Sequence, residues 1–241
     1  MAAGIAAHDL NYIAETGLLG LSAGADGAPV IPPALIADIA GGAYPAVINI
    51  LLALQQRAQT GKGCRLDIAM TDQLFPLVYW ALGNAFAAGR WPRPGGELVT
   101  GGSPRYRIYR TADDRFLAAA PLEQRFWDRF SRLIGLEERF RDDARDPAAT
   151  IARVAEIIRA DSAAEWEKRF AGEDVCCAIV RTLEEALADP HFRARGLFDH
   201  DLEAGRRSMP ALPVPVAPEF RSAAPVGSPA LGEANDLLDE S

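Results

Sequence analysis

The sequence has little cysteine and little histidine, and neither residue type is arranged as a metal or redox site. Cys64 stands alone, and the adjacent pair Cys176 and Cys177 lacks the CxxC spacing of zinc and thiol–disulfide sites. His191 and His200 show no metal-ligand spacing with these cysteines. Three cysteines are also too few for a disulfide framework. We therefore expect a chain of the reducing cytoplasm that works without a metal or redox cofactor.

Several standard motifs are also missing. The sequence contains no GxGxxG and no GxxxxGK[ST], which excludes the common nucleotide-binding loops, and no GxSxG, so a serine hydrolase is not supported. The net charge is −8, and the 25 lysines and arginines are scattered along the chain. Nucleic-acid binding needs clustered positive charge, so we expect no nucleic-acid partner. A pocket with a few well-placed arginines could still hold the phosphate of a small substrate.

A membrane span is not expected either. The longest apolar run near the start, from Ile31 to Leu54, is interrupted by Asp38 and by prolines that include Pro45. The N-terminus has no basic region followed by an apolar core, so a secretory signal is not predicted. With 49% hydrophobic residues in 241, the chain can bury a sizeable core and is expected to be soluble.

The first third of the chain predicts layered α/β structure. Apolar residues at helical spacing predict a buried helix that begins near Gly42 and ends before Gly61 as a C-cap. Residues 64–70 alternate as a strand would, and residues 71–88 read as an apolar helix. A helix, a strand and a second helix in this order indicate α/β layering.

Glycine and proline crowd residues 89–104, where we place a domain boundary. Beyond it the patterns predict a β-hairpin, then helices, then a returning strand and a proline-rich extended tail. The predicted ranges are 106–110 and 116–120 for the hairpin, 123–134, 147–159 and 162–172 for the helices, 174–180 for the strand and 199–241 for the tail.

Two polar residues near the start are candidates for chemistry. His8 opens an unusually polar segment that enters a glycine-punctuated loop, although a turn capped by Asp9 would explain the same pattern. Asp38 interrupts an apolar run just before Gly41 and Gly42, as either a helix cap or a functional carboxylate. Amide groups at such a helix N-terminus could also stabilise a developing oxyanion.

Two glutamates are weaker candidates. Glu123 opens an amphipathic helix, where a carboxylate could simply complement the helix dipole. Glu97 lies in the glycine-rich loop and is expected to be a solvated loop charge.

Taken together, several motifs resemble one family. They are His8-Asp9-Leu10-Asn11-Tyr12, Asp38-Ile39-Ala40-Gly41-Gly42, Gly61-Lys62-Gly63, Gly95-Gly96-Glu97-Leu98, Gly101-Gly102-Ser103-Pro104-Arg105-Tyr106, Tyr109-Arg110-Thr111-Ala112-Asp113, Leu122-Glu123, Asp189-Pro190-His191 and Pro229-Ala230-Leu231-Gly232-Glu233. This set is similar to the α-methylacyl-CoA racemases, which belong to the family III CoA-transferase (CaiB/BaiF) group. The resemblance runs over essentially the whole chain.

The resemblance implies an isomerase of lipid metabolism that needs no cofactor, because CoA is part of its substrate. By its motifs, His8 and Asp38 would be the catalytic acid/base pair that flanks the α-carbon of an acyl-CoA, and Glu123 would orient His8. Tyr12, Gly41 and Gly42 would contact the substrate. Two oppositely placed acid/base groups are what inversion of a stereocentre requires.

The resemblance also implies an α/β fold with part of a Rossmann-like large domain, a smaller α/β domain and an interlocked dimer. Residues 1–70 and the return segment 212–241 would belong to the large domain, 99–190 to the small domain, and 71–98 and 191–211 to linkers. Family members carry a long segment before the histidine motif, whereas this chain begins seven residues before His8. We therefore expect an N-terminally truncated member, a homodimer or one interlocked with a full-length relative.

Two other functions stay open. A family III CoA-transferase would use Asp38 as a nucleophile that forms an acyl anhydride, and would not need His8 or Glu123. A truncated remnant could also act only in assembly with a full-length relative. The presence of His8 together with Glu123 favours the racemase over the transferase. Intact His8, Asp38 and Glu123 weigh against the remnant, which the truncation supports.

Overall fold

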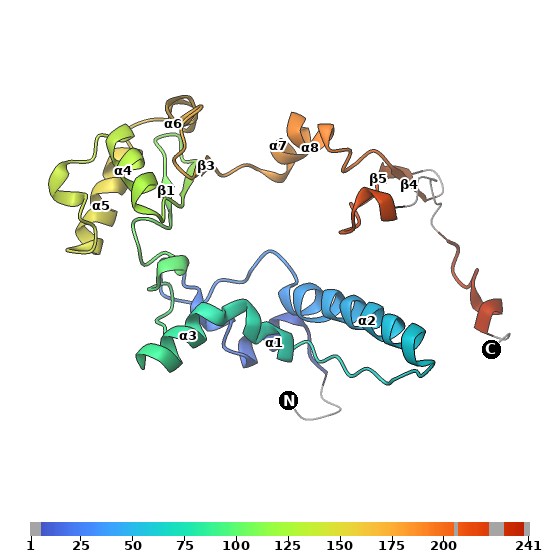
Figure 1. The fold of residues 1–241 in the computed structure, drawn as a ribbon. Coiled ribbons are helices and arrows are strands. Elements are labelled where there is room, and N and C mark those ends of the chain that lie inside the picture. The colour runs from blue at the N-terminus through green and yellow to red at the C-terminus, as the bar shows by residue number, and fades with distance from the viewer. Residues whose placement is uncertain (1–5, 205–206, 222–228, 239–241) are drawn as a thin grey trace. The chain divides into compact units, whose positions relative to one another are not determined.

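The computed structural model describes residues 6–204, 207–221 and 229–238, and it divides the chain into two compact units, Met1–Val180 and Arg181–Ser241. Figure 1 shows the elements of both units in chain order. The boundaries predicted for the large domain, small domain and linkers stay predictions.

The first elements of the chain pack around a small core. Helix α1 (Asp9–Glu15) lies against a π-helical segment, Ile36–Ala43, which also contacts a 3₁₀ helix, Asp72–Val78. Their buried side chains are Ile13, Ala37 and Leu74, with Tyr12 packed beside them. The segments that carry the histidine and aspartate motifs are therefore brought together by apolar contacts.

Helix α2 (Tyr44–Thr60) confirms the helix predicted after Gly42, and it ends as predicted. Gly61 adopts a left-handed conformation at φ +70°, and its N–H donates to the carbonyl of Arg57 at 2.8 Å. The prediction that this helix is buried is wrong for the chain as described, because none of its residues is buried and its large apolar side chains are exposed.

The interruption predicted within this apolar run is also wrong. The π-helical segment continues into α2, so a single helix runs from Ile36 to Thr60 through both Asp38 and Pro45. Pro45 is the second residue of α2, directly after the junction with the π-helical segment. By length and composition alone this helix could cross a membrane, a test that core helices of soluble proteins also pass.

Residues 64–70 do not form the predicted strand. They precede the 3₁₀ helix and, within the described ranges, no strand pairs with them. A strand needs backbone partners, and an alternating pattern alone does not supply them. The helix predicted over 71–88 is confirmed in part, as the 3₁₀ helix Asp72–Val78 followed by α3 (Tyr79–Ala88).

The predicted hairpin is confirmed. Strand β1 (Arg107–Arg110) pairs antiparallel with β2 (Phe116–Ala119), with Tyr109 opposite Leu117. The predicted returning strand is β3 (Cys177–Ile179), which pairs antiparallel with β2 and completes a sheet of order β1-β2-β3.

Three helices, α4 (Gln124–Leu133), α5 (Pro147–Ile158) and α6 (Ala163–Phe170), confirm the three predicted ones and gather at this sheet (Figure 1). Asp146 caps α5 by accepting from the N–H of Ala149, and Ser162 caps α6 by accepting from that of Glu165. Large side chains from these helices and the strands form the main core: Tyr109, Leu117, Trp127, Phe130, Leu136, Val154, Ile158 and Trp166.

The second unit contains helices α7 (Leu183–Ala188) and α8 (Pro190–Ala194) and the antiparallel strands β4 (Asp201–Ala204) and β5 (Arg207–Pro210). The extended tail predicted over 199–241 did not include this hairpin. The remaining short helices are 3₁₀ turns at Leu19–Leu21, Leu98–Thr100, Glu138–Phe140, Pro218–Phe220 and Asn235–Leu238.

Candidate active site

His8 stands at the N-cap of α1. Its backbone is extended, with φ −127° and ψ 175°, and its N–H donates to Oδ1 of Asn11 at 3.1 Å. Asn11 thus fixes the point at which the chain enters the helix, and the imidazole side chain of His8 is left at the surface. The polar character of this motif therefore has a local structural role.

Asp9 joins the histidine motif to the aspartate motif. It is only 7% exposed, and its Oδ1 accepts hydrogen bonds from the N–H groups of Ala37 at 2.6 Å and Asp38 at 3.0 Å. These N–H groups belong to the first turn of the helix that starts at Ile36, where a carboxylate is favoured by both hydrogen bonding and the helix dipole. Asp9 therefore fixes His8 relative to Asp38.

This arrangement corrects two expectations about Asp38. Asp38 does not cap the helix, because it lies inside the first turn and Asp9 takes the capping position from 28 residues away. The amide groups of Ala37 and Asp38 are occupied by Asp9, so they are not available to an oxyanion. Asp9 does act as a cap, as considered from the sequence, but on a distant helix.

His8 and Asp38 line one cavity of about 370 Å³. Asp9 borders it as well, and the rest of the lining is apolar: Leu10, Ile13, Ile31, Pro32, Ala34 and Leu35. A cavity of this size with apolar walls and two acid/base groups can hold a short hydrocarbon segment between a proton donor and a proton acceptor.

The other predicted contact residues lie outside the lining of this cavity. Gly41 and Gly42 have a packing role, since a Cβ on Gly41 would lie 2.6 Å from the carbonyl oxygen of Met70 and one on Gly42 would lie 2.9 Å from Cγ of Met70. Tyr12 packs against the small core. Their contact with substrate stays a prediction.

Glu123 is not brought to His8 within the chain. It is the N-cap of α4, its side chain is exposed, and among the described residues no hydrogen bond or ion pair joins it to His8. The predicted orienting contact is therefore not made by a single chain in this structure.

The expectation that Glu97 is a solvated loop charge is wrong. Its residue is 4% exposed, and its two carboxylate oxygens accept from Nη1 and Nη2 of Arg90 at 2.8 and 2.7 Å. The N–H of Arg93 also donates to it at 2.9 Å. The hydrogen bonds from Arg90, and next that from Arg93, lower the pKa of Glu97. Glu97 thus anchors the glycine-rich loop, a role its sequence neighbourhood does not reveal.

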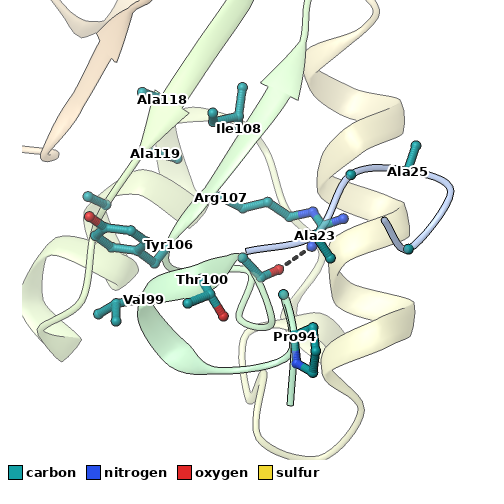
Figure 2. A pocket seen from close by; sticks show the side chains of 15 residues that line it. Ala23, Ala25, Pro94, Val99, Thr100, Tyr106, Arg107, Ile108, Ala118 and Ala119 are labelled. Carbon is teal, nitrogen blue, oxygen red and sulfur yellow. Dashed lines mark hydrogen bonds between the residues drawn. The ribbon is translucent and has the colours of Figure 1, made fainter. Parts of the chain in front are cut away.

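A larger cavity, of about 790 Å³, lies between this loop, the turn at residues 23–27 and the strands β1 and β2. Figure 2 shows its lining, with Arg107 extended toward Ala23 and hydrogen-bonded to the carbonyl of Gly101. Its lining contains no carboxylate and no histidine. It therefore lacks a pair of groups that could exchange a proton near neutral pH, and the smaller cavity is the better candidate.

The cysteines show no sign of a chemical role. Burial raises the pKa of the Cys177 thiol to about 12, so this thiol stays protonated at neutral pH. Within the described part of the chain, no group of three or more His, Cys, Asp or Glu side chains could hold a metal ion.

The chain belongs to the CoA-transferase family III, whose family model matches residues 2–235. It is 32% identical over 211 residues to the α-methylacyl-CoA racemase of Mus musculus, covering 86% of this chain and 55% of that protein. It is 31% identical over 244 residues to the racemase of Homo sapiens, covering 98% and 62%. The match to a succinate–glutarate CoA-transferase of Agrobacterium fabrum is 30% identical over 213 residues, covering 84% and 52%.

Solved structures show the same fold. Rv3272 of Mycobacterium tuberculosis superposes with a TM-score of 0.77 at 20% identity, covering 97% of this chain and 63% of that one. A CaiB/BaiF family protein of Brucella suis gives a TM-score of 0.73 at 24% identity, covering 98% and 62%. The expected α/β fold of family III CoA-transferases is thus confirmed. The chain spans 52–62% of the length of the curated relatives named above.

Proposed function

We propose that this chain forms the catalytic part of an enzyme that racemises 2-methylacyl-CoA thioesters. The observation that supports this best is the shared cavity of His8 and Asp38, whose relative position is held by the carboxylate of Asp9. An enzyme that inverts a carbon centre needs one acid/base group on each side of that carbon. The similarity to racemases of mouse and human supports the same reaction.

The proposed reaction has two proton transfers. One group, either the imidazole of His8 or the carboxylate of Asp38, removes the α-proton, and the electron pair of the broken C–H bond moves into an enolate of the thioester. The other group, which holds a proton, then gives it to the opposite face of the α-carbon, and the thioester carbonyl forms again. The two groups exchange roles with the hand of the substrate, and only the CoA of the substrate is required.

Glu123 has a supporting role in this proposal. A carboxylate beside His8 favours the imidazolium form and fixes the ring. Since the described part of a single chain does not join Glu123 to His8, we propose that the contact forms in an interlocked dimer, with a second copy or with a full-length relative.

The test is exchange of the α-proton of a 2-methylacyl-CoA in deuterated buffer. The chain is assayed alone and as a fusion that adds the N-terminal segment of a full-length relative. The variants His8→Ala and Asp38→Ala are assayed in the same two forms. Loss of one acid/base group is expected to slow exchange by about 10²–10⁴-fold. Absence of exchange from the restored protein contradicts the racemase proposal.

The second candidate is CoA transfer, which the similarity to a succinate–glutarate CoA-transferase favours. There the carboxylate of Asp38 would attack the thioester carbonyl and release CoA thiolate, leaving an acyl anhydride on Asp38. Hydroxylamine can trap that adduct. If it is trapped, and if α-proton exchange does not need His8, CoA transfer replaces the racemase proposal. A role in assembly alone is the third candidate, and co-purification with a full-length relative without added activity would favour it.

A further inference from the structure

Arg105 forms a largely buried ion pair with Asp143. Its Nε lies 3.0 Å from both carboxylate oxygens and its Nη2 lies 2.6 Å from Oδ1. The two side chains are only 16% and 12% exposed. A guanidinium held at two atoms by one carboxylate has a fixed orientation, so its remaining N–H groups point in defined directions.

The remaining N–H groups of Arg105 reach the residues on either side of Glu123. Nη1 donates to the carbonyl of Leu122 at 3.3 Å, and Nη2 donates to Oε1 of Gln124 at 2.9 Å. The guanidinium also lies over the ring of Trp127, 5.1 Å from its centroid, and Trp127 is fully buried. Arg105 therefore connects the start of α4 to Asp143 and to the ring of Trp127.

The backbone of Glu123 is held at the same place. Its carbonyl accepts from the N–H groups of Phe126 and Trp127, both at 3.0 Å. Its own carboxylate is exposed and has no hydrogen-bond partner among the described residues. Arg105 therefore holds the backbone on one side of Glu123, at Leu122, and the side chain on the other, at Gln124.

We propose that Arg105, locked by Asp143, is a positioning residue that aims the Glu123 carboxylate at His8. This inference rests on the proposed racemase function. A carboxylate that stabilises a charged imidazole works only at hydrogen-bond distance, and misplacement by about 1 Å can cost about 10²-fold in rate. The ion pair supplies the rigidity that an exposed glutamate at the start of a helix otherwise lacks.

The test measures α-proton exchange of wild type, Arg105→Met, Arg105→Lys, Glu123→Gln and the double variant Arg105→Met with Glu123→Gln. Arg105→Met is expected to lower kcat by about 10-fold to 100-fold with KM changed less than about two-fold. Arg105→Lys keeps the positive charge but lacks the planar guanidinium that makes several hydrogen bonds at once. Its kcat is expected to lie between those of Arg105→Met and wild type. The double variant is expected to be no slower than Glu123→Gln, because both changes remove one interaction.

The pH dependence separates positioning from general damage. A carboxylate at hydrogen-bond distance favours the charged form of an imidazole, so removing the carboxylate makes the neutral form available at lower pH. In the proposed reaction, His8 removes the α-proton of one stereoisomer of the substrate. For that stereoisomer, Arg105→Met and Glu123→Gln are both expected to move the acidic limb of the pH–rate profile to lower pH. A variant that is only less stable would show a lower maximal rate, and the acidic limb of its pH–rate profile would stay at the same pH.

Arg153→Met is the matched control. Arg153 also lies 3.0 Å through Nε from both oxygens of one carboxylate, that of Glu137. In the described part of the chain its hydrogen bonds and ion pairs go to Glu137 and Glu156, and none goes to residues 122–124. The kcat of Arg153→Met and the position of its acidic limb are expected to equal those of wild type. Equal losses in Arg153→Met and Arg105→Met, or additive losses in the double variant, overturn the positioning role.

A separate measurement keeps the two proposals apart. If wild type with the restored segment shows no exchange, the racemase proposal fails. Amide hydrogen exchange at Phe126 and Trp127, whose N–H groups bond the Glu123 carbonyl, then decides the role of Arg105. Faster exchange there in Arg105→Met than in Arg153→Met supports positioning of the Glu123 backbone. Unchanged protection at these amides in Arg105→Met overturns it.

Discussion

At the scale of single residues, Asp9 holds the candidate site together. It is expected that Asp9→Ala lowers the free energy of unfolding by about 1–3 kcal/mol, because the buried N–H groups of Ala37 and Asp38 lose their acceptor. Asp9→Asn keeps an acceptor oxygen but loses the charge at the helix start, so its loss should be smaller. Urea denaturation measures both. Asp26→Ala is the control, because the carboxylate of Asp26 also accepts a backbone N–H, that of Ala28, but in an exposed turn. It should lower the free energy of unfolding by less than either Asp9 variant.

Glu97 carries a prediction about pH. Its pKa is lowered in the folded chain by the hydrogen bonds from Arg90 and Arg93. A carboxylate with a lowered folded pKa contributes stability above its unfolded pKa, near 4.3, and this contribution is lost as pH falls through the folded value. Glu97→Gln should therefore be less stable than wild type at pH 7, and the difference should shrink below about pH 4. Thermal denaturation between pH 3 and 7 checks this, and a difference independent of pH would contradict it.

At the scale of elements, the approach of the π-helical segment to Met70 depends on glycine. Gly41→Ala would place a Cβ 2.6 Å from the backbone carbonyl of Met70, which cannot move aside as a flexible side chain can. The expected loss is about 1–3 kcal/mol of stability, from overpacking. Gly83 is a helical glycine in α3 with nothing within 4 Å of its Cβ position, so Gly83→Ala should be neutral or stabilising by up to about 1 kcal/mol. Equal denaturation midpoints for the two variants would refute this account.

The elements that could be predicted from the sequence are those with local signals. Gly61 ended α2 where expected, and the turn at Ala112–Arg115 placed the hairpin β1–β2, because caps and turns act over a few residues. The strand predicted over 64–70 failed because pairing needs a distant partner. The contacts of Asp9 with Ala37 and of Arg105 with Asp143 span 28 and 38 residues, a distance that no local pattern encodes. Local patterns marked His8, Asp38 and Glu123 as candidates, but only the family resemblance combined them into one site. The ion pair of Glu97 gave no local signal.

At the scale of the whole molecule, the exposed apolar surface of helix α2 is the main feature. It exposes a wide apolar face that includes Val47, Ile48, Leu51 and Leu54 at 44–61% exposure. Such a face is normally covered, either inside a larger fold or in a membrane. Membership of the CoA-transferase family III and the greater length of its relatives favour a protein cover over a lipid one.

The chain alone is therefore expected to associate through α2. Light scattering behind a sizing column should show an average mass that rises with concentration, because each buried Å² of apolar surface contributes about 25 cal/mol. Leu51→Glu places a charge in the exposed apolar surface and should shift the mass toward that of a monomer. Gln56→Glu adds the same charge on another side of α2 and should not. Flotation with phosphatidylcholine vesicles should leave the chain behind, and co-flotation would indicate a lipid cover for α2. A monodisperse monomer that unfolds in one cooperative step would show that α2 needs no cover, and the association account would fall.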